Sequence, residues 1–269
     1  MTSEGMSGRD DRIVQRVQAA ERAALKWFRI KVALVWIGLV ATLVLILYLA
    51  DEIDLEWTAT WGPLILDGAR TTILLTVISI VLAVMLAVLG ALGRLSSNPV
   101  AYGVASLYVS LVRGTPLLVQ ISFLYLALPQ LGVVIPAFES GVIALSFNYG
   151  AYLTEIFRAG IQAVPAGQRE AAQALGMHER HVMRRIVLPQ AVRIVIPAIG
   201  NDFIAMIKDS ALVSTIAVQE LLWRAERAGR QSLNSLQALL VAALVYWVLT
   251  IIFSFFQERL ERRMARSDR

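Results

Sequence analysis

The chain has 269 residues, a formal net charge of +5 and no cysteine, and 57% of its residues are hydrophobic against 17% charged. A soluble domain carries about 45–50% apolar and about 25% charged residues, so this composition excludes an ordinary soluble core and predicts a chain solvated mostly by lipid. The absence of cysteine excludes disulfides, thiol catalysis and cysteine-bound zinc or iron–sulfur sites. Nucleic-acid binding is not expected, because the basic residues cluster between apolar runs, as they do beside membrane spans.

The first apolar run of the chain follows a polar, basic segment of 31 residues. This run, Val32–Ala50, ends in acidic residues and has no small-residue cleavage site, so it predicts a retained span and not a signal peptide. It also lacks the polar stripe that a helix of a soluble bundle would show. Together with five later runs it predicts an all-α integral membrane protein with six transmembrane helices. The six spans are expected at Val32–Ala50, Thr71–Leu92, Val100–Leu128, Val142–Ala163, Ile186–Ile207 and Leu236–Phe256.

Spans three to five contain polar side chains, so hydropathy alone supports them less strongly than the other three. A charged group at the centre of a membrane helix costs about 2.5–3.5 kcal/mol on insertion scales, so it usually faces a cavity or a partner. The polar residues are Arg113, Glu155, Arg158, Arg193, Asn201 and Asp202. Counted at about 1.5 Å per residue, Arg113, Glu155, Asn201 and Asp202 fall at comparable, central depths, so these four are candidates for a solute path.

The distribution of basic residues predicts the orientation in the membrane. Residues 1–31 carry seven Lys or Arg, whereas Asp51–Asp67 carries five acidic residues and no basic one. The loop Val164–Arg185 holds four arginines, and the tail after Gln257 holds five. The positive-inside rule therefore predicts that both termini and this loop are cytoplasmic.

One loop disagrees with this orientation. Ala211–Ser235 should be external, yet it carries three arginines, at 224, 227 and 230, against the acidic residues Glu220 and Glu226. The other four segments agree with the six-span topology, so we keep it. A docking surface is the alternative role for this loop.

The cytoplasmic loop carries a motif, EAAQALGMHERHVMRRIVLP, from Glu170 to Pro189. Its first part is rich in good helix formers, and Gly176 suits the left-handed position that ends a helix. A second short helix is expected to run into the fifth span, where Pro189 is tolerated in a first turn. The loop is therefore predicted to form a helical hairpin whose small alanines let a partner approach closely, with Glu170 favoured by the helix dipole.

The spacing E-A-A, three residues, Gly, nine residues, I-x-L-P resembles the EAA loop of type I ABC importer permeases. The matching residues are Glu170, Ala171, Ala172, Gly176, Ile186, Leu188 and Pro189. The strings VRGTPLLVQ, YGAYLTEIFRAGIQAVP and NDFIAMIKDSALVS are similar to the polar amino acid uptake permeases, the group that handles histidine, glutamate, glutamine and arginine. The resemblance runs from about Gly68 to the C-terminus. Many members have five spans, so the extra helix Val32–Ala50 is a departure.

The resemblance implies a permease subunit of an ATP-driven importer in the bacterial cytoplasmic membrane. It implies a five-helix core, a second permease subunit that is identical or a sister chain, two cytoplasmic ATPase subunits and an extracytoplasmic solute-binding protein. The chain has no GxxxxGK[ST] motif, so ATP and Mg are expected on the ATPase subunits, with no cofactor and no enzymatic activity in this chain.

The expected organisation has four parts. A cytoplasmic tail covers residues 1–31, and the extra helix with an external segment covers 32–67. The permease domain covers 68–258, with its coupling loop at 164–185, and a second cytoplasmic tail covers 259–269.

The expected functional residues form two groups. For coupling to the ATPase they are Glu170, Ala171, Ala172 and Gly176. For the substrate they are Arg113, Thr115, Glu155, Asn201, Asp202 and Ser210. An amino acid zwitterion needs donors for its carboxylate, which Arg113 and the backbone N–H groups freed at 114–116 would supply. It also needs an acceptor for its ammonium group, from Glu155 or Asp202.

Several polar and charged residues have an alternative explanation in which they serve the structure and not the substrate. Glu155 and Arg158 are three residues apart on one helix face and would pair with each other. Arg193 would snorkel to the interface, and Lys208 and Asp209 would be interfacial anchors. His178 and His181 offer at most a weak metal site, and a solvated helix face is the expected role.

Other classes of membrane protein fit less well. A secondary transporter would need repeated halves with interrupted helices, and the sequence has no convincing internal repeat. A membrane enzyme would need a cluster of histidines or paired carboxylates, and a channel would not need an ATPase-docking loop. An importer of another solute, such as a sugar or phosphate, is the nearest alternative, and the three strings around the motif argue against it.

The orientation predicts the accessibility of introduced thiols. The natural chain has no cysteine, so single Ser3→Cys, Ser267→Cys and Thr58→Cys variants have no background. In intact cells we expect an impermeant thiol reagent to label the variant at Thr58 and to leave the two terminal variants unlabelled. Labelling of both termini from outside would invert the topology.

Overall fold

A computed structural model describes residues 24–265, except 29, 43, 47 and 49–53. The chain divides into two compact units, residues 1–55 and 56–269, which we describe separately. In the first unit the helix Ala24–Ile46 is long and apolar enough to cross a membrane, and it begins before the expected start at Val32. Residues 1–23 of the expected N-terminal tail lie outside the described residues.

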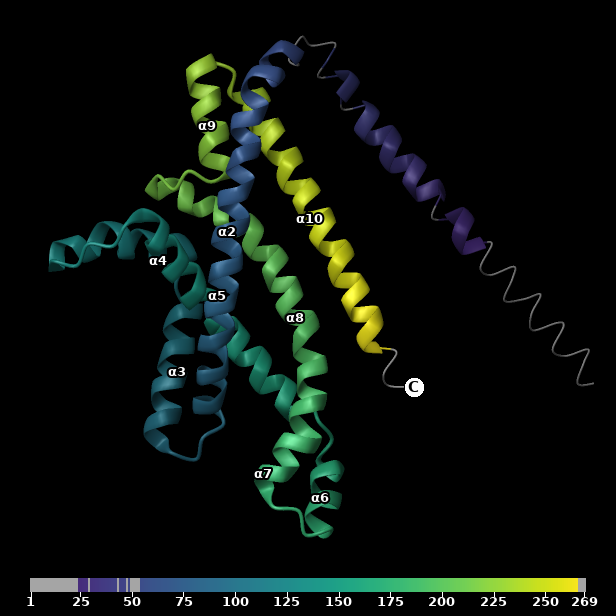
Figure 1. Ribbon diagram of the computed structural model, residues 1–269, viewed down its shortest axis with the longest axis vertical. Helices are drawn as coiled ribbons and strands as arrows, with labels where there is room; N and C mark the ends of the chain where they lie inside the picture. Colours follow the sequence, from purple (N-terminus) through teal and green to yellow (C-terminus); the bar gives the residue numbers. More distant parts are fainter. Residues whose placement is uncertain (1–23, 29, 43, 47, 49–53, 266–269) are drawn as a thin grey trace, which may run out of the picture. The chain divides into compact units, whose positions relative to one another are not determined.

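The second unit is helical throughout its described length, apart from short connections (Figure 1). Its α-helices are α2 (Leu55–Arg94), α3 (Pro99–Arg113), α4 (Leu117–Ser122), α5 (Ala137–Gln162), α6 (Ala166–Ala174), α7 (Glu179–Val182), α8 (Leu188–Asp209), α9 (Leu221–Ser232) and α10 (Ser235–Ala265). Two π-helical segments, η1 (Phe123–Ala127) and η3 (Met183–Val187), and two 3-10 segments, η2 (Leu128–Leu131) and η4 (Ser210–Ile216), continue these helices. The all-α class is confirmed for this part of the chain.

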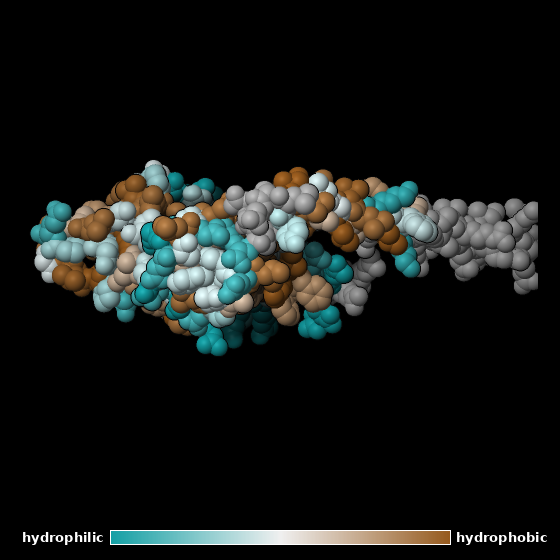
Figure 2. Space-filling model, turned by 90° about the horizontal axis from the view of Figure 1, so that it is seen from above, coloured by the Kyte–Doolittle hydropathy of each residue, from teal (hydrophilic) through white to brown (hydrophobic). Residues whose placement is uncertain are grey.

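Four helices among the described residues are long and apolar enough to cross a membrane, or five if a bent pair counts as one span. They are Ala24–Ile46, α2, Glu179–Ile216 and Ser235–Met264, and the bent pair joins Pro99–Arg113 to Leu117–Leu131. The fourth expected span, Val142–Ala163, falls in α5, which is less apolar because it carries residues such as Asn148, Glu155 and Arg158. Hydrophobic side chains (brown) lie exposed on the surface in Figure 2, as expected where lipid is the solvent.

The third expected span is broken. Its two parts meet at an angle of 103°, and the break lies at Thr115 and Pro116. Pro116 has no N–H, so it cannot donate to the carbonyl of Val112, and its ring disfavours a helical conformation at the residue before it. The side-chain amide of Gln120 takes over, donating to Val112 O at 2.8 Å and to Thr115 O at 3.1 Å. The carbonyl oxygens of Val112 and Thr115 therefore keep hydrogen-bond donors although the helix is broken.

The core of the second unit lies where α2 and α5 meet α8 and η4. Its fully buried side chains include Leu75, Leu145, Leu153, Met206 and Val213. Small residues bring the helices close together. A Cβ on Gly160 would lie 2.7 Å from Val195, and one on Gly90 would lie 2.3 Å from Thr154. These glycines therefore serve close helix contact, as in other membrane bundles.

The hairpin predicted from the motif is present as α6, a turn and α7. Gly176 has φ +76°, and its N–H donates to Gln173 O at 2.9 Å. The N–H of Met177 donates to Ala172 O at 3.1 Å, which completes a Schellman cap. The predicted left-handed end of the first hairpin helix is confirmed.

Glu155 lies between two arginines. Its carboxylate accepts from Arg158 Nη2 at 2.7 Å and from Arg94 Nε at 3.0 Å. Arg94 also donates to Ser106, and its guanidinium lies 5.0 Å from the centre of the Tyr102 ring. The side chain of Glu155 is only 18% exposed. This cluster, which joins α2, α3 and α5, confirms the pairing of Glu155 with Arg158 and adds a second partner.

The cluster predicts that Glu155 acts in stability. In Glu155→Gln two guanidinium groups lose a shared anion, and we expect a cost of about 1–3 kcal/mol, seen as a lower thermal unfolding temperature in detergent. In Glu155→Gln/Arg158→Gln we expect only partial recovery, because Arg94 still lacks its partner.

The matched control is Glu258→Gln, which removes an exposed ion pair with Arg262 at 2.8 Å. It should change stability by less than about 1 kcal/mol. A large rise in the substrate concentration for half-maximal uptake in Glu155→Gln, with unchanged stability, would contradict the structural role.

Candidate functional site

A cavity of about 580 Å³ lies at the break after α3. The segment from α3 to α4, the middle of α5 and the C-terminal half of α8 all contribute to its walls. The lining residues are Arg113, Gly114, Thr115, Pro116, Leu117, Asn148, Tyr149, Tyr152, Asp202, Ala205 and Asp209. Pro116 interrupts the helix at this point, and the cavity lies beside the interruption.

The positive side of the cavity is Arg113, the last residue of α3. Its guanidinium lies over the Tyr152 ring, 5.0 Å from the ring centre, a cation–π contact that helps to hold the side chain in place. The N–H of Gly114 donates to Ser110 O at 3.0 Å, and Pro116 has none. Of the two backbone N–H groups in residues 114–116, only that of Thr115 therefore remains as a candidate donor.

The negative side of the cavity comes from two carboxylates seven residues apart on α8. Asp209 accepts a hydrogen bond from the hydroxyl of Tyr149 at 2.8 Å. Oδ2 of Asp202 is buried and has no hydrogen-bond partner among the described residues. An unsatisfied buried polar atom is costly and calls for an explanation, and a ligand that donates or carries positive charge is one.

The structure brings together three of the six residues predicted for the substrate, Arg113, Thr115 and Asp202. Ser210 is buried outside this lining, and its hydroxyl donates to Ile207 O at 2.7 Å. Asn201 is exposed and does not line the cavity, and Glu155 belongs to the arginine cluster.

Four polar lining residues were not predicted as substrate contacts. They are Asn148, Tyr149, Tyr152 and Asp209. The sequence contains a signal for them, because residues four or seven apart share one face of a helix. Asp209 follows Asp202 by seven residues, and Tyr152 follows Asn148 by four. Asp209, expected as an interfacial anchor, faces the cavity.

The hairpin of α6 and α7 forms a second site, at the end of the second unit opposite α9 (Figure 1). Glu170 and Ala171 are exposed, whereas Ala172 is buried in a small core with Val182 and Val187. Of the two alanines, Ala171 is thus available to a partner and Ala172 holds the hairpin together. The amide of Gln190 donates to Gln168 and so ties α6 to the start of α8.

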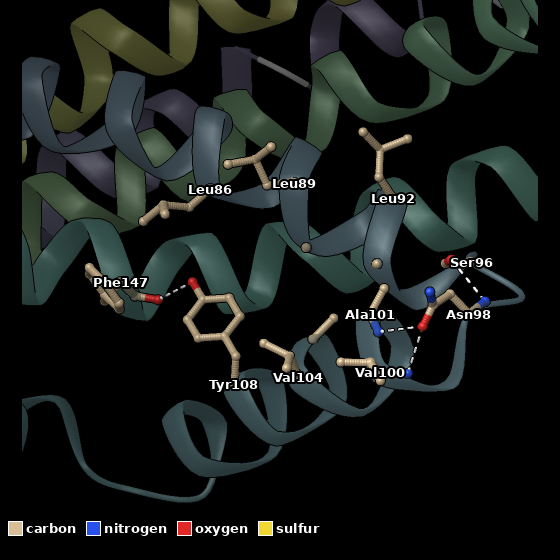
Figure 3. A pocket seen from close by; sticks show the side chains of 13 residues that line it. Leu86, Leu89, Leu92, Ser96, Asn98, Val100, Ala101, Val104, Tyr108 and Phe147 are labelled. Atoms are coloured by element: carbon tan, nitrogen blue, oxygen red, sulfur yellow. Dashed lines mark hydrogen bonds between the residues drawn. The ribbon is translucent and has the colours of Figure 1, made fainter.

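A larger hollow of about 840 Å³ lies between α2 and α3 (Figure 3). Among the described residues, none that lines it is charged. Leu86, Leu89 and Val104 are among its walls, and the Tyr108 hydroxyl donates to Phe147 O at 2.8 Å within it. Such a lining offers no opposite charge to either end of a zwitterion, so the cavity at Arg113 is the better candidate for a polar solute.

Known proteins resemble the chain in sequence and in structure. It is 41% identical over 214 residues to the L-cystine transport system permease protein TcyB of Bacillus subtilis (strain 168), a match that covers 79% of this chain and 91% of that relative. It is 38% identical to the arginine transport system permease protein ArtQ of the same organism, covering 81% of this chain and 100% of the relative.

A crystal structure of an amino acid ABC transporter with histidines superposes with a TM-score of 0.76 and 40% identity, over 78% of this chain and 99% of that one. The family model for the binding-protein-dependent transport system inner membrane component matches residues 79–266. That range includes the break, the cavity and the hairpin, and it excludes the N-terminal helix. The chain therefore belongs to the family of inner membrane components of binding-protein-dependent transport systems.

Proposed function

We propose that the chain is the permease subunit of an ABC importer that carries polar amino acids across the bacterial cytoplasmic membrane. The observation that carries the proposal is the cavity at the α3 break, which a guanidinium and two carboxylates line together inside a membrane protein. Relatives named for cystine, arginine and glutamine transport support the substrate class.

The cavity fits the two charged groups that all amino acids share. Arg113 offers paired N–H donors to the α-carboxylate, since a guanidinium binds a carboxylate through two parallel hydrogen bonds. Asp202 offers its unpartnered Oδ2 to the α-ammonium group. Asp209 is already engaged by Tyr149, and it is left for a polar or cationic side chain of the substrate. A phosphate would meet two carboxylates, and a sugar has no need of them.

In the proposed transporter the two ends of the second unit contact different partner proteins. Exposed Glu170 and Ala171 present the hairpin to one of two cytoplasmic ATPase subunits, which bind ATP and Mg while this chain holds no cofactor. A second permease subunit completes the pathway, and a solute-binding protein delivers the amino acid from outside. Both termini are cytoplasmic, as the distribution of basic residues favours.

The proposal predicts separable roles for neighbouring residues of α8. Asp202→Asn should raise the substrate concentration for half-maximal uptake in proteoliposomes by at least about tenfold, because losing one partner of a buried charge pair costs about 2–5 kcal/mol. Arg113→Gln should have a similar effect. The control is Asn201→Ala, which changes the adjacent residue outside the cavity and should leave uptake nearly unchanged. Equal effects of Asp202→Asn and Asn201→Ala would exclude the cavity as the substrate site.

The hairpin predicts a coupling defect. Glu170→Lys reverses an exposed charge, and Gly176→Leu strains a left-handed position by about 1–2 kcal/mol. Both variants should insert into the membrane yet lose most of the ATPase stimulation that the liganded solute-binding protein produces. Gly176→Asn is the matched control, since asparagine tolerates this conformation, and it should keep stimulation. Unreduced stimulation in both Glu170→Lys and Gly176→Leu would remove the coupling role.

A further inference from the structure

We propose that the outward face and tip of α9, made of Arg227, Arg230, Gln231 and Leu233 and here called the α9 patch, is where an acidic surface of the solute-binding protein docks. The inference rests on the proposed function, because it assumes a solute-binding protein as partner. It concerns the one loop whose charge the positive-inside rule does not explain.

The patch lies far from the membrane interior. α9 runs antiparallel to the first part of α2, since Trp57 Nε1 donates to Ser232 Oγ at 2.7 Å and a Cβ on Gly68 would meet Leu221 Cα at 2.7 Å. From Thr71, where the second span is expected to begin, to Trp57 a helix rises about 21 Å. The headgroup layer adds only about 5–8 Å to each side of the hydrocarbon core. The C-terminal end of α9 therefore projects into water.

The two sides of α9 differ in the way a water-facing helix requires. Ala225, Ala228 and Gly229 are buried, and the alanines pack in one core with Trp57 of α2 and Ala238 of α10. Arg227, Arg230 and Gln231 are exposed on the other side. A lipid-facing helix would expose apolar side chains there, so the exposed side is suited to a soluble partner.

The patch keeps an unneutralised positive charge. Arg224 pairs with Asp67 at 2.7 Å, and Arg230 pairs with Glu226 at 3.3 Å. Arg227 lies 5.4 Å from the centre of the Trp223 ring, which orients the guanidinium without cancelling its charge. A complementary partner surface is acidic. Anionic lipid headgroups are the less suitable partner, because they lie about 10 Å or more below the tip.

The tip adds an exposed apolar side chain in a strained conformation. Leu233 is 94% exposed and has φ +57°, at the left-handed position that ends α9. This position usually holds glycine, and a leucine there costs about 1–2 kcal/mol. Neither packing nor backbone preference explains the leucine. An apolar contact with a docked protein explains both its exposure and the retained strain.

The patch is rigidly connected to the rest of the molecule. Glu220, fully buried, begins α9 and accepts hydrogen bonds from the Trp223 N–H at 2.8 Å, from the Thr72 hydroxyl at 3.3 Å and from the Tyr246 hydroxyl at 2.5 Å. The segment η4 leads directly from the cavity residue Asp209 towards α9. A protein held on the patch therefore sits beside the segment that leads into the cavity.

The test uses the assembled transporter in proteoliposomes and measures the concentration of its solute-binding protein that gives half-maximal ATPase stimulation. Arg227→Glu/Arg230→Glu should raise this concentration at least about tenfold at low salt, because favourable charge speeds association by at least that factor. The shift should shrink at about 1 M salt, where the screening length is about 3 Å. Basal ATPase activity should not change. Arg70→Glu, at an 88% exposed arginine on the outer part of α2, is the control and should have little effect.

Leu233→Gly separates docking from folding. It removes the strain, so its thermal unfolding temperature should equal or exceed that of the natural protein, yet it should also raise the half-maximal concentration. Unchanged half-maximal concentrations in both patch variants would overturn the inference while leaving the proposed function intact. An effect present in vesicles with phosphatidylglycerol and absent in pure phosphatidylcholine would assign the patch to lipid and overturn it. If the binding protein does not stimulate the natural transporter at all, the proposed function itself fails.

Discussion

A proline within a membrane helix leaves a carbonyl without its donor, and lipid offers no replacement. In this chain Pro116 leaves Val112 in that position, and the amide of Gln120, four residues further on, supplies the missing hydrogen bond at 2.8 Å. This substitution allows the third span to turn by 103° without an unsatisfied backbone group at Val112. The cavity is lined by the residues of this break, so its polar lining depends on a helix interruption whose free carbonyl has found another donor.

Charged side chains within the helices of the second unit are stabilised in two different ways. Glu155 accepts from two arginines on two helices, which makes it part of the packing. Asp202, on the neighbouring α8, keeps a buried oxygen without a partner among the described residues. In the sequence both carboxylates are candidates for the substrate ammonium group, and only Glu155 has an evident partner, Arg158. The difference in their partners is the physical reason why we propose a structural role for Glu155 and a substrate role for Asp202, since a buried polar group that is left open calls for a ligand.

At each end of the second unit a short helix ends at a residue in the left-handed conformation. The two residues differ in the free-energy cost of adopting that conformation. At the hairpin Gly176 adopts φ +76° without strain. At the opposite end Leu233 adopts φ +57° and is almost fully exposed. A relaxed cap fits the coupling role that we propose for the hairpin. A strained, exposed leucine fits the docking role that we propose for the tip of α9.

The sequence by itself determined the lipid environment, the apolar parts of the helices and the hairpin with its glycine cap, because hydropathy, helix propensity and capping depend on neighbours within a few residues. It predicted neither α9, which lies in an expected loop, nor the start of α2 at Leu55. It also contained the Glu155–Arg158 pair, which spans one helical turn. Only the tertiary structure decided that Arg94 completes this pair, that Ala172 faces its own chain, and that Arg113, Asp202 and Asp209 line one cavity. These facts depend on how each helix is rotated and crossed against the others. That rotation is set by packing among side chains far apart in the chain, which no local pattern specifies.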